Sequence, residues 1–101
     1  MLQPVNFESL TVNSASAVSL TAAKLIRDNA SPPIAIEVQV LGAPINVRAD
    51  GTAPTTALGG GTRYEPTSVF RITTQPGLRN FQAILAADAA MNATINVHYM
   101  V

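Results

Sequence analysis

Val47-Arg48-Ala49-Asp50-Gly51-Thr52-Ala53-Pro54-Thr55 marks the point where an apparent strand of this 101-residue chain ends in a turn. The side chain of Asp50 can accept a hydrogen bond from the backbone two residues later, and Gly51 adopts positive φ without steric cost. Pro54 fixes its own φ and restricts the preceding residue to extended geometry. We therefore predict a structural turn made by Asp50, Gly51 and Pro54.

The turn leads into a segment that contains Gly59-Gly60-Gly61 and ends near Thr62. Three successive glycines offer no side chain for packing and leave the backbone its greatest freedom. A loop of about a dozen residues is long for a compact domain, and long loops commonly carry function or become ordered against a neighbour. We therefore expect the 52–62 loop to contact a partner.

Alternating apolar residues indicate strands before and after this loop. Upstream, residues 34–41 alternate strictly, and the pattern resumes at 45–48 after Leu41-Gly42-Ala43-Pro44, which predicts an antiparallel hairpin over 34–49. Downstream, further strands are predicted over 63–65, 68–73, 78–85 and 93–101, with a type II turn at Gln75-Pro76-Gly77.

The N-terminal part of the chain is less regular. Residues 1–4 are expected to form an extended arm, because Pro4 cannot donate to a ladder and termini fray unless they are held. A strand is predicted over 5–12, with a bulge near Ser9 where the alternation changes face. Residues 17–26 read either as a second strand or, over 22–27, as a short helix, and the limited length favours the strand.

These segments amount to about seven or eight short strands at intervals typical of all-β domains. We predict a single antiparallel β-sandwich domain over residues 1–101, with the jelly roll as one form of it. Phe7, Phe70 and Phe81 are expected in the core. Tyr64 and Tyr99 are expected to present their hydroxyls at an edge.

The composition favours a protein partner over nucleic acid or a membrane. Charged residues make up only 12% of the chain, and six basic and six acidic residues cancel to zero net charge. No basic stripe is present to neutralise phosphates, and no cationic amphipathic face is present for lipid. A neutral, charge-poor surface is suited to fitting against another protein. The N-terminus lacks the features of a signal peptide, so synthesis is expected in the cytoplasm.

No catalytic constellation is apparent, and we expect neither an enzyme nor a cofactor. Without cysteine, thiolate catalysis and cysteine-bound zinc are excluded. His98 is the only histidine and is expected to face solvent or an interface. Asp50, Glu65 and Asp88 do not have the spacing of a calcium loop, so a turn role for Asp50 is favoured.

Three segments carry a resemblance: Arg48-Ala49-Asp50-Gly51-Thr52-Ala53-Pro54-Thr55, Leu78-Arg79-Asn80-Phe81-Gln82-Ala83-Ile84 and Ala93-Thr94-Ile95-Asn96-Val97-His98-Tyr99. They resemble a family of small structural proteins of tailed bacteriophages that carry an Asp-Gly-Thr-x-Pro-Thr turn and a C-terminal alternating strand with tyrosine. The similarity lies within residues 34–101. The Gly-Gly-Gly run departs from the glycine pattern of that family.

The resemblance implies a virion protein on the head surface, namely a decoration or cement protein that binds across capsid subunit junctions. Its expected partners are the major capsid protein and further copies of itself, often as a homotrimer. Two alternatives remain, a tail, neck or baseplate adaptor and a carbohydrate-binding module for host attachment. The residues expected to contact a partner are Pro4, Phe7, Arg48, Arg63 and Tyr64.

Overall fold

The computed structural model describes residues 3–27 and 29–101, and most of the regular structure in these ranges is β-strand. The elements follow in the order β1 (Pro4–Val12), β2 (Val18–Ser19), the 3-10 helix η1 (Ala22–Leu25), β3 (Ala35–Leu41), β4 (Ile45–Arg48), β5 (Thr62–Tyr64), β6 (Val69–Ile72), α1 (Gln75–Asn80), β7 (Gln82–Leu85) and β8 (Ala93–Met100).

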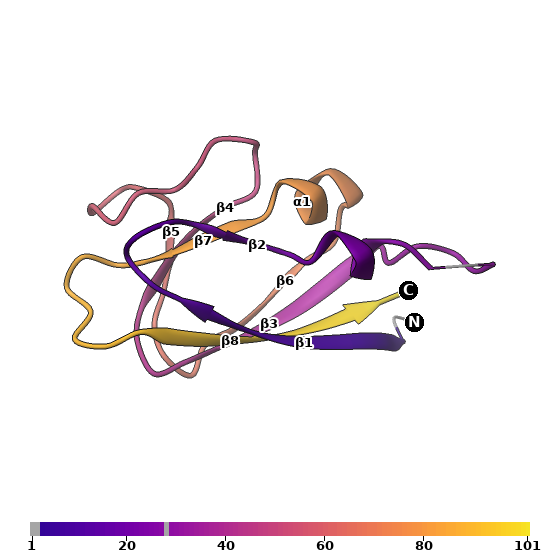
Figure 1. Ribbon diagram of the computed structural model, residues 1–101, viewed down its shortest axis with the longest axis horizontal. Coiled ribbons are helices and arrows are strands. Elements are labelled where there is room, and N and C mark those ends of the chain that lie inside the picture. The colour runs from indigo at the N-terminus through magenta and orange to yellow at the C-terminus, as the bar shows by residue number, and fades with distance from the viewer. Residues whose placement is uncertain (1–2, 28) are drawn as a thin grey trace.

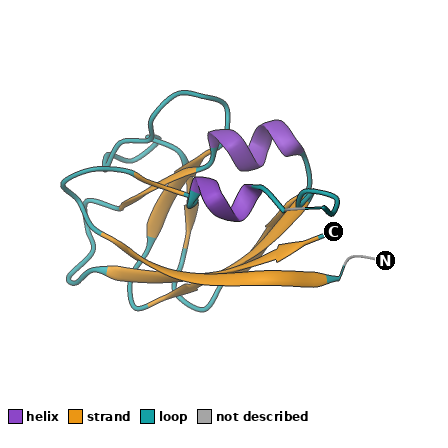
Figure 2. Ribbon diagram, turned by 45° about the vertical axis from the view of Figure 1, so that its right-hand side comes forward, coloured by secondary structure: helices purple, strands orange, loops and turns teal. Residues whose placement is uncertain are grey.

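The strands form two antiparallel four-stranded sheets, so the predicted all-β sandwich is confirmed (Figure 1). The first sheet has the order β1-β8-β3-β6, and the second has the order β2-β7-β4-β5. The pairing is nested along the chain, because β1 pairs with β8, β2 with β7, β3 with β6 and β4 with β5. The two helices, η1 and α1, lie side by side near the end of the molecule that carries both termini (Figure 2).

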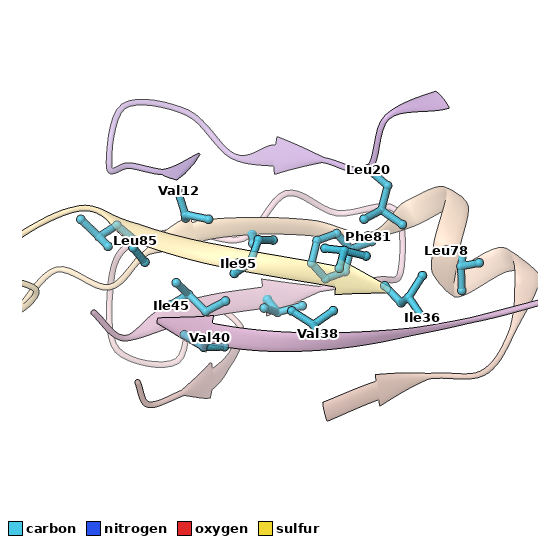
Figure 3. Close-up of a cluster of buried hydrophobic side chains, with 14 of the residues drawn as sticks. Val12, Leu20, Ile36, Val38, Val40, Ile45, Leu78, Phe81, Leu85 and Ile95 are labelled. Carbon is cyan, nitrogen blue, oxygen red and sulfur yellow. The ribbon is translucent and has the colours of Figure 1, made fainter. Parts of the chain in front are cut away.

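The hydrophobic core lies between the two sheets (Figure 3). Alternation along each strand turns every second side chain inward, and this pattern is clearest in β3 and β8. The fully buried side chains include Ile36, Val38, Val40, Ile45, Leu78, Phe81, Ile95, Val97 and Tyr99. Of the three phenylalanines expected in the core, Phe81 is fully buried and Phe70 packs at its margin, whereas Phe7 is exposed on the outer face of β1.

The predicted hairpin over 34–49 is wrong, because β3 and β4 belong to different sheets. Their connection carries the chain across the core: Gly42 has a φ of +87°, Ala43 is buried, and the carbonyl of Pro44 accepts a hydrogen bond from Ala86 N beside the second sheet. Alternation reports which side chains are buried, and both strands bury theirs in the same core. It does not report which strand pairs with which.

In two places the structure has a helix where the sequence predicts a strand or a turn. Residues 17–26 contain only the two-residue strand β2 followed by η1, so the short-helix alternative describes residues 22–25 better than the strand. The predicted turn at Gln75-Pro76-Gly77 is the first turn of α1, capped by Thr74, whose hydroxyl accepts a hydrogen bond from Gly77 N at 3.1 Å. Burial of Leu78 fixes this helix against the core, so the following strand begins at Gln82.

The predicted arm over residues 1–4 is wrong at Gln3 and Pro4, while residues 1–2 lie outside the described part of the chain. Gln3 exchanges two backbone hydrogen bonds with Val101, at 2.8 and 3.0 Å, and Pro4 is the first residue of β1. The C-terminal residue thus holds the N-terminal strand in place. The irregularity of β1 lies between Pro4 and Asn6 and not near Ser9. Proline has no backbone N–H for the ladder, which accounts for this position.

Candidate functional site

The turn after β4 has the geometry that the sequence predicts. Asp50 Oδ1 accepts a hydrogen bond from Thr52 N at 3.3 Å, Gly51 has a φ of +89°, and Pro54 is buried. Arg48 also binds both carboxylate oxygens of Asp50. The hydrogen bond from Arg48 is the main cause that lowers the pKa of Asp50 to about 2. Arg48 is therefore neutralised within its own chain.

The loop after this turn is tied to the second sheet. The buried amide of Asn46 donates to the carbonyls of Thr55 and Ala57, at 2.9 and 3.1 Å. Within the loop, Thr55 N donates to Gly60 O, and Gly60 N donates to Ala57 O, both at 2.9 Å. The loop over residues 52–61, which we call the Leu58 loop, presents Leu58 with 96% of its surface exposed. An apolar side chain is thus held outward on a fixed backbone.

A hollow of about 410 Å³ opens between β4 and β5 of the second sheet and β6 of the first. Tyr64 and Phe70 stack across the two sheets at this side, with ring centroids 3.8 Å apart and planes 10° from parallel. Arg48 and Asp50 also line the hollow, which we call the β4–β6 hollow. Of the predicted contact residues, Arg48 and Tyr64 are therefore brought together here.

Arg63 faces the other side of β5 and belongs to a separate ionic cluster. It forms two hydrogen bonds to the carboxylate of Asp88, at 2.9 and 3.0 Å, and a third to Glu65. The hydrogen bonds that Arg63 donates to Asp88 and then to Glu65 raise the pKa of Arg63, and the pKa of Asp88 is lowered in turn. Within residues 3–27 and 29–101, no group of three metal-ligating side chains comes together. Glu65 and Asp88 are thus engaged with an arginine.

The outer face of the first sheet carries a row of side chains in register on all four strands. Phe7 of β1 lies opposite His98 of β8, which lies opposite Glu37 of β3, which lies opposite Arg71 of β6. The rings of Phe7 and His98 are 4.8 Å apart, and Arg71 binds Glu37 at 2.9 Å. His98 is exposed, as the sequence predicts, and Phe7 retains 46% of its surface.

A second row follows on the same face, made by Ser9, Asn96, Gln39 and Val69. Ser9 Oγ donates to Asn96 Oδ1 at 2.7 Å, and Asn96 Nδ2 donates to Gln39 Oε1 at 3.4 Å. Val69 ends the row with 57% of its surface exposed. The two rows form a surface in which polar groups bind one another, with an exposed apolar residue near each edge.

A buried carboxylate lies on the inner face of β1. Glu8 accepts hydrogen bonds from Thr21 N at 3.1 Å, from the Thr21 hydroxyl and from the hydroxyl of Tyr99. Tyr99 is fully buried, so the prediction that its hydroxyl lies at an exposed edge is wrong. Burial and then the hydrogen bond to Glu8 raise the pKa of Tyr99 far above its usual range. Through Thr21, an exposed residue that follows β2, this group ties β1 and β8 of the first sheet to the segment after β2.

The predicted contact residues do not form one site. Pro4 and Phe7 lie on β1, Arg48 and Tyr64 line the β4–β6 hollow, and Arg63 belongs to the ionic cluster. Sequence reasoning identified the loop but missed Leu58, its most exposed apolar residue. The available signal was a leucine placed directly before three glycines, where no neighbouring side chain can cover it.

Comparisons with protein-family models, curated proteins and solved structures found no match to the chain. None of the helices in the described residues is long and apolar enough to cross a membrane.

Proposed function

We propose that this protein is a non-enzymatic structural protein of a bacteriophage particle that decorates the capsid by binding across subunit junctions. The observation that carries this proposal is the outer face of the first sheet, with its two registered rows from Phe7 to Arg71 and from Ser9 to Val69. A surface whose ion pair is already formed and which carries exposed apolar residues is suited to lie against another protein surface. The expected partner is the major capsid protein.

The nested strand pairing supports the proposal at the level of fold. Eight strands in the orders β1-β8-β3-β6 and β2-β7-β4-β5 favour the jelly-roll form of the sandwich. Jelly rolls occur in viral capsid and lectin domains. This support is an analogy, since one fold serves many functions. The resemblance of the Asp50–Thr55 turn to phage structural proteins points in the same direction.

The docking face is tested with Phe7→Ser, because Phe7 is a half-exposed apolar side chain beside the registered polar groups. Empty capsids would be incubated with increasing amounts of protein, and bound copies would be counted by quantitative gel analysis. We expect the variant to need at least about tenfold more protein for half occupancy, the effect of losing about 1.4 kcal/mol per site. Met91→Ser, a similarly exposed apolar residue in the 86–92 connection, serves as the control.

Unchanged occupancy of the Phe7→Ser variant would remove this face from the interface. The number of copies per particle separates decoration from a tail, neck or baseplate adaptor, since decoration requires hundreds of copies and an adaptor only one ring. An adaptor would use the same face on a smaller partner.

A carbohydrate-binding module is favoured by one specific feature of the same face. Asn96, Gln39, Glu37 and Arg71 present planar polar groups on the same face as the Phe7 ring, and such groups can hydrogen-bond the hydroxyls of a sugar. A glycan array tests this second candidate. Specific binding of an oligosaccharide that Phe7→Ser abolishes would place host attachment ahead of decoration.

A further inference from the structure

Two apolar features of the surface are left without a partner among the described residues. One is Leu58, exposed over 96% of its surface at the tip of its loop. The other is the β4–β6 hollow, whose walls include Val47, Tyr64, Phe70 and Ile72. Leu58 is not among the residues that line this hollow, so the chain does not fill it with its own leucine. A protruding apolar side chain and a hollow with apolar walls can bury apolar surface against each other.

The Leu58 loop is held in one conformation before any partner binds. The Asn46 side chain on β4 donates hydrogen bonds to two carbonyls of the loop. Two backbone hydrogen bonds, from Thr55 N to Gly60 O and from Gly60 N to Ala57 O, close the loop on itself. A Cβ atom at Gly60 would lie 2.1 Å from Thr55 Oγ1, so this close approach requires glycine. Ala87 N also donates to Thr56 O and ties the loop to the connection after β7. Binding through Leu58 therefore costs little ordering of the loop.

The β4–β6 hollow is suited to an uncharged apolar group. Its one ionic feature is the pair of Arg48 and Asp50, which bind each other through two hydrogen bonds. The residues beside Leu58 are Ala57 and Gly59, which bring no charge to this pair. The volume of the β4–β6 hollow, about 410 Å³, lies within the range of pockets that hold small ligands. The hollow therefore has room for one side chain with its adjoining backbone.

We propose that Leu58 of one copy inserts into the β4–β6 hollow of a second copy of this chain. The second copy is favoured as the occupant because one molecule carries both complementary parts, and because the chain has zero net charge, so copies do not repel one another at long range. The two parts are different surfaces, so the contact is head-to-tail and generates a closed ring or an open chain. It involves neither row of the outer face of the first sheet and goes beyond the proposed function.

Two variants separate the two parts of this contact. Leu58→Ser removes the protruding side chain at a fully exposed position and leaves the hollow intact. Thr62→Trp fills the hollow from the wall formed by β5, where Thr62 is exposed and an aromatic residue suits a strand. Ala49→Trp fills the hollow from the β4 side and replaces Thr62→Trp if that variant fails to fold. Met91→Ser is the matched control for loss of an exposed apolar side chain.

The experiment is light scattering on the purified chain at micromolar to millimolar concentration. We expect the unmodified protein and Met91→Ser to self-associate, and each of the other variants to have the mass of one chain. A mixture of Leu58→Ser with Thr62→Trp retains one intact protruding leucine and one open hollow, so it should form pairs with twice that mass and nothing larger.

A monomeric unmodified protein at the highest concentration would overturn the proposal. So would an oligomer that Leu58→Ser leaves intact, or a mixture of the two variants that stays monomeric. Loss of capsid binding by Phe7→Ser with self-association retained would concern the proposed function alone, which keeps the two proposals distinguishable.

Discussion

At the β1/β2 side of the sandwich a buried carboxylate of the first sheet binds the segment that follows β2, whereas at the β5/β6 side an aromatic stack joins the two sheets. On the first side, the carboxylate of Glu8 binds Thr21 and Tyr99. On the second side, Tyr64 of β5 lies flat on Phe70 of β6. β1 and β2 are the edge strands on one side of the sandwich, and β6 and β5 are the edge strands on the other. Each side is closed by a different kind of interaction.

The difference shows how chemistry determines what remains open at the edge of a sandwich. A buried carboxylate requires hydrogen-bond donors, and Glu8 is bound by those of Thr21 and Tyr99. An aromatic stack has no such requirement and covers only the area of its rings. The β4–β6 hollow remains next to the stack. The hydrogen-bonded side is therefore suited to stability, and the stacked side is suited to binding.

Removal of the carboxylate should have the largest effect. In Glu8→Ala, the Tyr99 hydroxyl loses its acceptor in a buried site and Thr21 N loses its acceptor in a partly buried one, and we expect the free energy of unfolding to fall by about 3 kcal/mol. Urea denaturation measures this change. Glu37→Ala on the outer face removes an exposed ion pair with Arg71 and should cost at most about 1 kcal/mol. Equal losses for the two variants would contradict the structural role of Glu8.

Removal of the stack should have a smaller effect. Tyr64→Ala deletes a half-buried ring and its contact with Phe70, and we expect a loss of about 2 kcal/mol in urea denaturation. Tyr64→Phe keeps the ring and should stay within about 0.5 kcal/mol of the unmodified protein. A Tyr64→Phe variant as unstable as Tyr64→Ala would show that the hydroxyl, and not the stacking, closes this side.

The central strands and the turn after β4 were predictable from the sequence. Alternation predicted β3 and β8, because their inward side chains are all apolar and the period of two is a local property. The turn at Asp50 and Gly51 was predicted for the same reason, since a turn is determined by adjacent residues. The eight strands and the sandwich followed from these local patterns.

The contacts that close the sandwich were not predictable in the same way. Glu8 and Tyr99 are 91 positions apart, and an acidic residue within a strand reads as solvent-facing until the fold brings its donors to it. The β3–β4 connection failed as a hairpin because partner choice depends on the whole sheet. The β4–β6 hollow is likewise formed by three strands from both sheets, so no single segment indicates it.

Acidification should produce the smallest effect of the three, and it should weaken the β1/β2 side through Glu8. Burial alone would raise the pKa of Glu8, but the hydrogen bonds from Thr21 and Tyr99 together outweigh it and lower the pKa below its ordinary value of 4.5. The folded-state pKa is thus below that of the unfolded chain. The resulting stabilisation is fully present above the unfolded value and is lost as the pH falls through the folded value.

Glu8→Gln isolates this contribution, because the amide has the shape of the carboxylate but does not titrate. At pH 7 we expect the unmodified protein to be more stable than the variant in urea denaturation, and at about pH 3 the difference should become smaller. Asp50 and Asp88 also have lowered pKa values, but both are exposed and are present in both proteins, so they cancel in the comparison. A difference that stays constant with pH would mean that Glu8 stabilises this side through the acceptor oxygen that the amide lacks and not through its charge.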